Sequence, residues 1–126
     1  MDVQKIAWLA AAGACGTLAR YGVGGLVHRL VKSPLPWGTL VINGSGCLLF
    51  GLIWSATAEH WSLRADVRSY ILIGFMGAYT TFSTFAFETT ALLRDGEWLL
   101  AFANFAGQNL LGLAFMFVGM ALGRLL

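Results

Sequence analysis

GFMGAYTTFSTF, residues 74 to 85, lies inside a long apolar segment of this 126-residue chain. It combines two glycines and three phenylalanines with the hydroxyl side chains of Tyr79, Thr80, Thr81, Ser83 and Thr84. Glycine costs about 1 kcal/mol relative to alanine inside a helix. Hydrocarbon lipid offers no hydrogen-bond partner to hydroxyls or to freed backbone groups. The stretch therefore predicts a helix that is interrupted near residues 77 to 80, with its polar groups turned toward protein or a cavity.

The composition around this stretch is that of a membrane protein. The chain is 58% hydrophobic and only 11% charged, whereas a soluble domain carries roughly 25% charged residues. Its length suits a single domain, residues 1–126. We therefore expect a small integral membrane protein surrounded by the lipid bilayer.

Four apolar segments, at about residues 6–27, 39–58, 69–93 and 98–122, account for most of the chain. Each has about 20 to 25 residues, enough to cross a hydrocarbon core of about 30 Å at 1.5 Å per residue. Alternation with a period of two is absent, which argues against a β-barrel. The predicted fold class is an all-α membrane protein with four transmembrane helices, of which the third is interrupted near its centre.

The basic residues outside the spans are nearly balanced between the two sides of the membrane. With four spans, the N-terminus, the second loop and the C-terminus share a side, which holds Lys5, Arg64, Arg68 and Arg124. The other side holds Arg29, Lys32 and Arg94. An excess of Lys and Arg in cytoplasmic loops normally sets the orientation. The balance leaves two hypotheses: an ordinary protein with a weak bias, or insertion in both orientations, which would allow an antiparallel homodimer.

Motifs for enzyme chemistry are missing from the sequence. Cys15 and Cys47 form no CxxC pair, and His28 and His60 belong to no HExxH or other metal-ligand pattern. The net charge of +2 gives no indication of a nucleic-acid partner. We expect a protein that is not an enzyme.

Two polar residues stand out in the first and second spans. An arginine at the centre of a span costs at least about 2.5 kcal/mol, so Arg20 faces a partner or a watery cavity unless it reaches the interface by snorkelling. Asn43, among the glycines of GTLVINGSG (38–46), offers two donors and one acceptor. It could line a polar route or simply hydrogen-bond between closely packed helices.

The third and fourth spans leave further alternatives open. Phe82 and Phe85 share a helical face, where their positive ring edges could attract an anion or their rings could pack in a core. Glu88 is either a proton carrier or a solvated residue near the end of its span. Asn104 and Gln108, four residues apart, could extend a polar track or bond between helices. The segment GMALG (119–123) is a GxxxG pattern that is typical of close helix contact.

These polar groups are mostly donors, namely amides, hydroxyls, ring edges and a guanidinium, which favours a small anion over a cation. Four short helices can hardly enclose a pore and also bury such groups, so we expect the chain to associate.

Three segments, GACGTLARY (13–21), GTLVINGSG (38–46) and GFMGAYTTFSTF (74–85), together resemble the Fluc/CrcB fluoride channels. They occur in the order of that family, within a four-span chain of the family's length. The chain departs from the family pattern at Ala78, where a second consecutive glycine is frequent. It also has Asn104 and Gln108 in a span that commonly shows tyrosine and serine, so the resemblance assigns no residue of the fourth span.

The resemblance implies a passive, highly selective channel of the inner (plasma) membrane that exports cytoplasmic fluoride and gives fluoride resistance. It also implies an antiparallel, dual-topology homodimer with two pores. The residues that it implies for the fluoride pore are Asn43, Phe82, Phe85, Ser83, Thr81 and Thr84. Arg20 would lie near a vestibule and attract anions. Backbone carbonyls of Gly77 and Thr80 from both subunits would hold a structural sodium ion at the dimer centre.

Two other functions can be compared with a channel. A proton-coupled small multidrug transporter also has four spans, but it needs a deep carboxylate, and here the first span has no acid and Glu88 is near an end. A non-transporting assembly subunit would use its glycines for packing alone, and would leave the arginine, asparagine and threonine constellation unexplained. Fluoride flux without a pH gradient would separate the channel from both.

Overall fold

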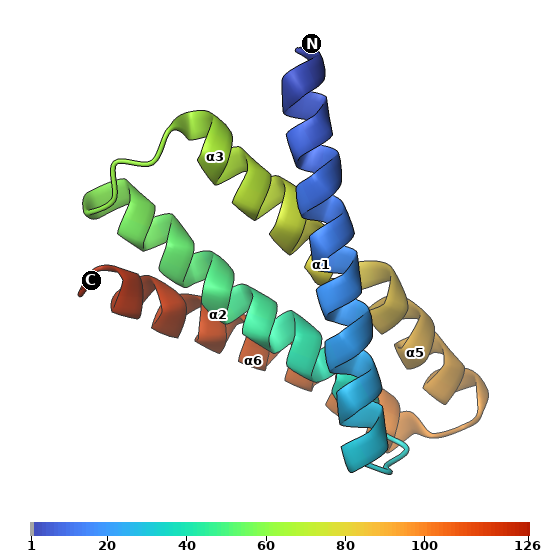
Figure 1. Cartoon of the computed structure of the whole chain (residues 1–126). Helices are drawn as coiled ribbons and strands as arrows, with labels where there is room; N and C mark the ends of the chain where they lie inside the picture. Colours follow the sequence, from blue (N-terminus) through green and yellow to red (C-terminus); the bar gives the residue numbers. More distant parts are fainter. Residues whose placement is uncertain (1) are drawn as a thin grey trace.

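A computed structural model describes residues 2–126 of the chain, so only residue 1 of the predicted domain lies outside it. The described part is helical apart from its connecting segments (Figure 1). The elements are α1 (Val3–Leu30), α2 (Trp37–Glu59), α3 (Ala65–Ser69), the π-helical η1 (Tyr70–Met76), α4 (Gly77–Tyr79), α5 (Phe82–Arg94) and α6 (Trp98–Gly123). This confirms the all-helical fold class.

Three stretches are long and apolar enough to cross a membrane, namely Trp37–Glu59, Ala65–Arg94 and Trp98–Gly123. They coincide with the second, third and fourth predicted spans. The first predicted span lies within α1, whose 28 residues are long enough, but α1 is not among the helices that are sufficiently apolar. Arg20 and the glycines of α1 lower its hydropathy. By composition, therefore, three of the four predicted spans are confirmed.

Helices α2 and α6 form the most extensive helix pair and run in the same direction (Figure 1). Glycines bring their backbones together. A Cβ atom on Gly119 would collide with the carbonyl oxygen of Leu48, and one on Gly123 would collide with that of Leu52. Both glycines of the predicted GxxxG pattern therefore face α2, which confirms the expected close contact.

Helix α1 crosses the third apolar stretch at a second glycine contact. A Cβ on Gly16 would meet the carbonyl oxygen of Phe75, and a Cβ on Gly74 would lie 2.9 Å from that of Ala12. In Figure 1, α3 and α5 lie on opposite sides of α1. The close crossing therefore places the middle of the third stretch directly against α1.

The backbone of the third stretch changes conformation twice. It is π-helical over Tyr70–Met76, which the sequence pattern did not predict. The helix ends at Tyr79 and a new one starts at Phe82, and the intervening Thr80 and Thr81 are extended (ψ 159° and 111°). Gly77 is helical, with φ −62° and ψ −34°. The expected opening at residues 77 to 80 is therefore displaced toward the two threonines.

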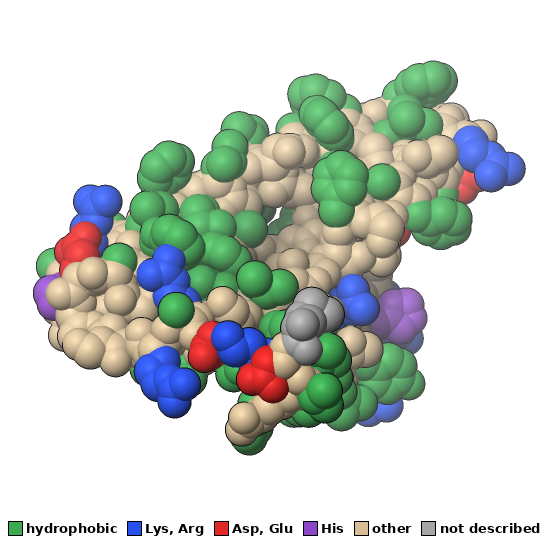
Figure 2. Space-filling model, turned by 90° about the horizontal axis from the view of Figure 1, so that it is seen from above, with side chains coloured by type: hydrophobic (Ala, Val, Ile, Leu, Met, Phe, Trp, Pro, Cys, Tyr) green, Lys and Arg blue, Asp and Glu red, His purple; other side chains and the backbone are tan. Residues whose placement is uncertain are grey.

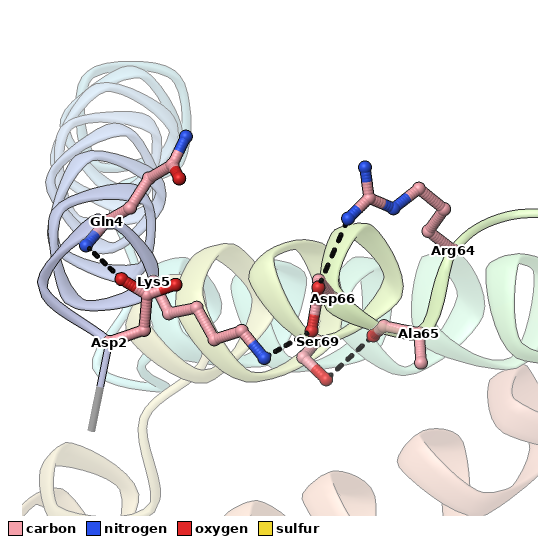
Figure 3. A network of polar contacts seen from close by, with 7 residues as sticks. All are labelled: Asp2, Gln4, Lys5, Arg64, Ala65, Asp66 and Ser69. Atoms are coloured by element: carbon pink, nitrogen blue, oxygen red, sulfur yellow. Dashed lines mark hydrogen bonds and ion pairs between the residues drawn. The ribbon is translucent and has the colours of Figure 1, made fainter.

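The ends of the helices show which loops share a side. Lys5 Nζ lies 3.0 Å from Asp66 Oδ1, and Arg64 Nη2 lies 3.6 Å from Asp66 Oδ2 (Figure 3). The hydrogen bond from Lys5 to Asp66 raises the pKa of the Lys5 ammonium. At the other end of the same loop, Arg124 Nε lies 3.5 Å from Glu59 Oε1. The N-terminus, the second loop and the C-terminus therefore meet on one side, as the charge count assumed.

Hydrophobic side chains project from much of the helical surface (Figure 2). On α6 the largest exposed ones include Leu99, Phe102, Leu113 and Phe117. A single chain thus presents apolar faces that suit lipid or a further chain, as expected of a membrane protein.

Candidate functional site

The side chain of Asn43 binds the extended segment between α4 and α5. Its Oδ1 atom accepts a hydrogen bond from the backbone N–H of Thr81 (2.9 Å), and its Nδ2 atom donates to the carbonyl oxygen of Thr81 (3.1 Å). The amide thereby replaces the helical partners that Thr81 loses where the helix stops. Of the two hypotheses for Asn43, hydrogen bonding between helices is what the single chain displays.

Gln108, on α6, completes this contact. Its Oε1 atom accepts a second hydrogen bond from Asn43 Nδ2, at 3.1 Å. An asparagine amide has two N–H groups, so both are used, one by Thr81 and one by Gln108. Three membrane-embedded elements, α2, α6 and the break, therefore meet at Asn43.

The hydroxyl groups of the opening stretch gather at the start of α5. Thr81 is the N-cap residue, and its Oγ1 atom accepts from the backbone N–H of Thr84 (3.2 Å) and donates to Thr84 Oγ1 (2.9 Å). Ser83 Oγ lies 3.5 Å from Thr81 Oγ1. Thr81 is buried, whereas Ser83 and Thr84 are exposed. The structure thus brings together the three predicted hydroxyls in one capping cluster.

The two predicted phenylalanines contact each other edge to face. The ring centroids of Phe82 and Phe85 lie 5.5 Å apart with an interplanar angle of 61°. Phe85 is buried and also stacks on Phe105 of α6, at 6.3 Å. Phe82 is 78% exposed. One ring therefore belongs to the core, and the other lies on the surface of the single chain.

Arg20 reaches the break from α1. Its Nη1 atom donates to the carbonyl oxygen of Thr80 at 3.4 Å. The two hypotheses for Arg20 were snorkelling and an orientation toward a partner or a watery cavity; this part-buried contact supports a partner. The guanidinium also places a positive charge beside the extended segment.

A second polar cluster lies farther along α5. Thr39 Oγ1 donates to Glu88 Oε1 (2.7 Å), and Asn104 Nδ2 donates to Thr89 Oγ1 (2.9 Å). Asn104 is completely buried. Glu88 is therefore hydrogen-bonded to α2, and it also lines an open cavity beside the loop that follows α1.

Three buried side-chain atoms have no hydrogen-bond partner within residues 2–126: Glu88 Oε2, Asn104 Oδ1 and Gln108 Nε2. Two of them are acceptors and one is a donor. Sequence reasoning named these residues but could not tell which atom of each was left over.

Open cavities border both clusters. One of about 310 Å³ at the break is lined by Asn43, Thr80, Thr81 and Phe82 among others. Another of about 320 Å³ is lined by Thr39 and Glu88 together with the loop that follows α1. No group of three or more His, Cys, Asp or Glu side chains that could hold a metal ion occurs in the described part of the chain. The oxygens that the described residues offer to a cation near the break belong to backbone carbonyls, hydroxyls and side-chain amides.

Comparison with known proteins agrees with this picture. The family model described as "CrcB-like protein, Camphor Resistance (CrcB)" matches residues 7–120. The protein named fluoride-specific ion channel FluC from Nitrosococcus oceani is 52% identical over 123 residues, which cover 98% of each chain. Its namesake from Solidesulfovibrio magneticus is 52% identical over 124 residues, which cover 98% of this chain and 99% of the relative.

With its three apolar spans, the chain is a multi-pass protein of the plasma membrane. The family match extends over nearly all of the described helices, including the break and the residues around it. The resemblance seen in the three sequence segments is thereby confirmed, and the chain belongs to the CrcB family.

Proposed function

We propose that this protein is a passive, selective fluoride channel that lets cytoplasmic fluoride leave the cell and so gives fluoride resistance. The relatives at 52% identity carry the name of fluoride-specific ion channels. The structural observation that carries the proposal is the opened segment at Thr80 and Thr81, held by Asn43 and followed directly by the hydroxyl and phenylalanine cluster. Irregular backbone is tolerated at membrane depth where it is buried in protein or lines a cavity.

The chemistry of these groups suits a small anion. Fluoride is compact and strongly hydrated, so removing its water without replacement would cost tens of kcal/mol by a Born estimate. Hydroxyls of Thr81, Ser83 and Thr84 and the positive edges of Phe82 and Phe85 would replace that water in steps. Neutral donors also let the ion leave again, which conduction requires. Arg20 would raise the local concentration of anions at the entrance to this route.

The proposed channel is an antiparallel homodimer with two pores. The near balance of basic residues between the two sides supports insertion in both orientations. The exposure of Phe82 and the open cavity at the break support a second chain at this face. In such a dimer each pore would be completed by residues of both subunits.

A structural sodium ion at the dimer centre is part of this proposal. In a continuous α-helix, the Thr81 N–H would donate to the carbonyl of Gly77, four residues earlier. Here it donates to Asn43 instead, so that the Gly77 carbonyl is freed. The Thr80 carbonyl receives only the long bond from Arg20. Carbonyl oxygens of unwound helices are suitable ligands for sodium, and the residues present therefore fit the ion.

The test is fluoride efflux from liposomes that contain the purified protein, with a potassium gradient and valinomycin to control the voltage. Chloride-loaded liposomes and the Asn43→Asp variant run in parallel. We expect rapid fluoride loss with chloride retained, and slower fluoride loss in the variant, because a carboxylate repels the anion. Folded protein that releases no fluoride would refute the channel, and proton-coupled drug exchange would then be measured.

A further inference from the structure

An open cavity of about 470 Å³ lies between the start of α1 and α3. Its volume is within the range of about 300–1,000 Å³ that is usual for small-ligand sites. It is open because α1 and the third stretch diverge toward their outer ends from the close contact at Gly74 (Figure 1). The cavity shares no described lining residue with the one at the break, so it is separate from the face proposed for a second copy.

The walls of this cavity have a charged outer layer and an aromatic inner layer. In the outer layer, Lys5 Nζ of α1 lies 3.0 Å from Asp66 Oδ1 of α3. About one helical turn farther in, the rings of Trp8 and Tyr70 stack with their centroids 6.4 Å apart. Tryptophan and tyrosine are enriched at membrane–water interfaces, where their rings lie at the level of the lipid headgroups. The cavity is therefore placed to receive a headgroup.

The outer layer keeps a positive charge that is available to an anion. Asp66 is shared by two cations, because Lys5 lies on its Oδ1 atom while Arg64 Nη2 lies 3.6 Å from its Oδ2 atom (Figure 3). Two cations and one carboxylate leave one positive charge. The Arg64 contact is too long for a hydrogen bond, and its side chain is 83% exposed. Its guanidinium can thus bind a phosphate through two parallel hydrogen bonds.

Asp2 adds a carboxylate to the same cavity. Its Oδ1 atom accepts from the backbone N–H of Gln4 at 3.1 Å, as the N-cap of α1. A carboxylate has a second acceptor oxygen, which is available to an ammonium group of a ligand. A purely anionic headgroup would be repelled by Asp2, whereas a headgroup with both a phosphate and an ammonium matches the charges of both signs.

We propose that this cavity binds the headgroup of an aminophospholipid, that is, a lipid with a phosphate and a primary ammonium. The phosphate would bind Arg64 and the remaining N–H groups of Lys5, and the ammonium would donate to Asp2. The rings of Trp8 and Tyr70 would contact the glycerol region below. Phosphatidylethanolamine has this chemistry. Phosphatidylcholine has no N–H for Asp2, and phosphatidylglycerol has no cation.

The first test is native mass spectrometry of the purified full-length protein, with equal amounts of phosphatidylethanolamine, phosphatidylcholine and phosphatidylglycerol that have the same acyl chains. We expect phosphatidylethanolamine to be retained about two- to fivefold more than phosphatidylcholine, the effect of one partly exposed ion pair, and more than phosphatidylglycerol. Equal retention of the first two, or a preference for phosphatidylglycerol, would overturn the proposal. In a separate arm, soluble glycerophosphoethanolamine retained as well as the lipid would assign the cavity to a free headgroup and overturn the lipid. None of these measurements depends on fluoride conduction.

Two substitutions separate the two halves of the headgroup. Asp2→Asn keeps the N-cap of α1, because asparagine caps about as well as aspartate, but removes the charge for the ammonium. It should abolish the preference for phosphatidylethanolamine over phosphatidylcholine. Arg64→Gln removes the guanidinium and should lower the retention of both lipids about two- to fivefold, since both carry the phosphate.

Arg124→Gln is the matched control. Arg124 lies on the same side of the membrane but pairs with Glu59, outside this cavity, so its loss should leave lipid retention as in the wild type. If Arg64→Gln retained as much lipid as Arg124→Gln, or if Asp2→Asn kept the preference for phosphatidylethanolamine, the proposal would be overturned. All three substituted positions are exposed, and gel filtration and circular dichroism check that each variant is folded.

Discussion

Asn43 combines two tasks that the sequence could not separate. Its amide satisfies both backbone groups of Thr81, in the place of the helical hydrogen bonds lost at the break. It also orients the amide of Gln108. A residue that resembles a pore-lining donor in the family pattern thus holds the backbone in this chain, and its neighbour on α6 keeps the free donor.

Replacing Asn43 by leucine is expected to destabilise the protein. The change keeps the number of side-chain heavy atoms and the branching but leaves a backbone N–H and a carbonyl of Thr81 without the Asn43 amide, at a cost of about 1–3 kcal/mol for each unpaired group. Unfolding in SDS, followed through the fluorescence of the five tryptophans, measures the difference. Asn109→Ala is the control, and an Asn43→Leu protein as stable as this control would contradict the role of Asn43 at the break.

Thr81→Val tests the cap of α5. Valine has nearly the same shape but cannot accept the hydrogen bond from the Thr84 N–H. Loss of a helix N-cap costs about 1 kcal/mol. Thr90→Val is the matched control, since Thr90 is exposed and bonds only to the Ala86 carbonyl of its own helix. In the same unfolding assay, Thr81→Val should be less stable than Thr90→Val. If Thr90→Val were the less stable variant, capping by Thr81 would be excluded.

At the scale of the elements, close packing of glycines determines where the helices cross. Gly119 and Gly123 let α6 contact the backbone of α2, while Gly16 and Gly74 let α1 cross the third stretch. Gly77, in contrast, is helical and has no atom within 4 Å of an added Cβ in the single chain. Its role in folding one chain is therefore small, although the pattern of the opening stretch suggested otherwise.

Two glycines of α6 give a matched pair of variants. In Gly119→Ala the new methyl group would collide with the Leu48 carbonyl, whereas in Gly112→Ala it would lie 3.6 Å from the Cys47 sulfur, an ordinary contact. We expect Gly119→Ala to destabilise by about 1–3 kcal/mol through overpacking, and Gly112→Ala to change stability little. If both variants were equally stable, α2 and α6 would be able to move apart and accommodate the methyl group without a loss of stability.

At the scale of the whole molecule, a single chain leaves apolar faces and the break partly uncovered. The basic residues of its loops give almost no preference for one orientation. Both features agree with the proposed antiparallel dimer, in which a second copy covers the break.

Added lysines in the loops should break this balance. Ser62→Lys with Leu63→Lys adds positive charge on the side of the second loop. Asp95→Lys with Glu97→Lys adds positive charge on the opposite side. All four positions are exposed. Each double variant should insert in one orientation and lose fluoride efflux, because lysine-rich loops remain in the cytoplasm. Coexpression of the two should restore efflux. Full activity of either variant alone, with its termini shown by labelling to lie on one side, would exclude an antiparallel dimer.

Much of this protein could be predicted from the sequence, because lipid imposes simple rules. Apolar length located the helices, and paired glycines indicated close contacts. Hydroxyls and glycines in an apolar run predicted an opening near residues 77 to 80. The observed opening lies at Thr80 and Thr81, slightly farther along the chain than predicted, because glycine tolerates an open backbone without requiring one. The apolarity of α1 was overestimated, since Arg20 and the glycines count against it.

The sequence by itself determined a small helical membrane protein, the identity of its polar residues and its family. The tertiary structure decided which polar atoms of those residues are engaged in hydrogen bonds. Asn43 and Gln108 are 65 positions apart in the chain, and no spacing rule indicates that they meet or how their amides are turned. The orientation of a hydrogen bond depends on partners that folding brings together, and here the backbone of Thr81 determines it for both side chains.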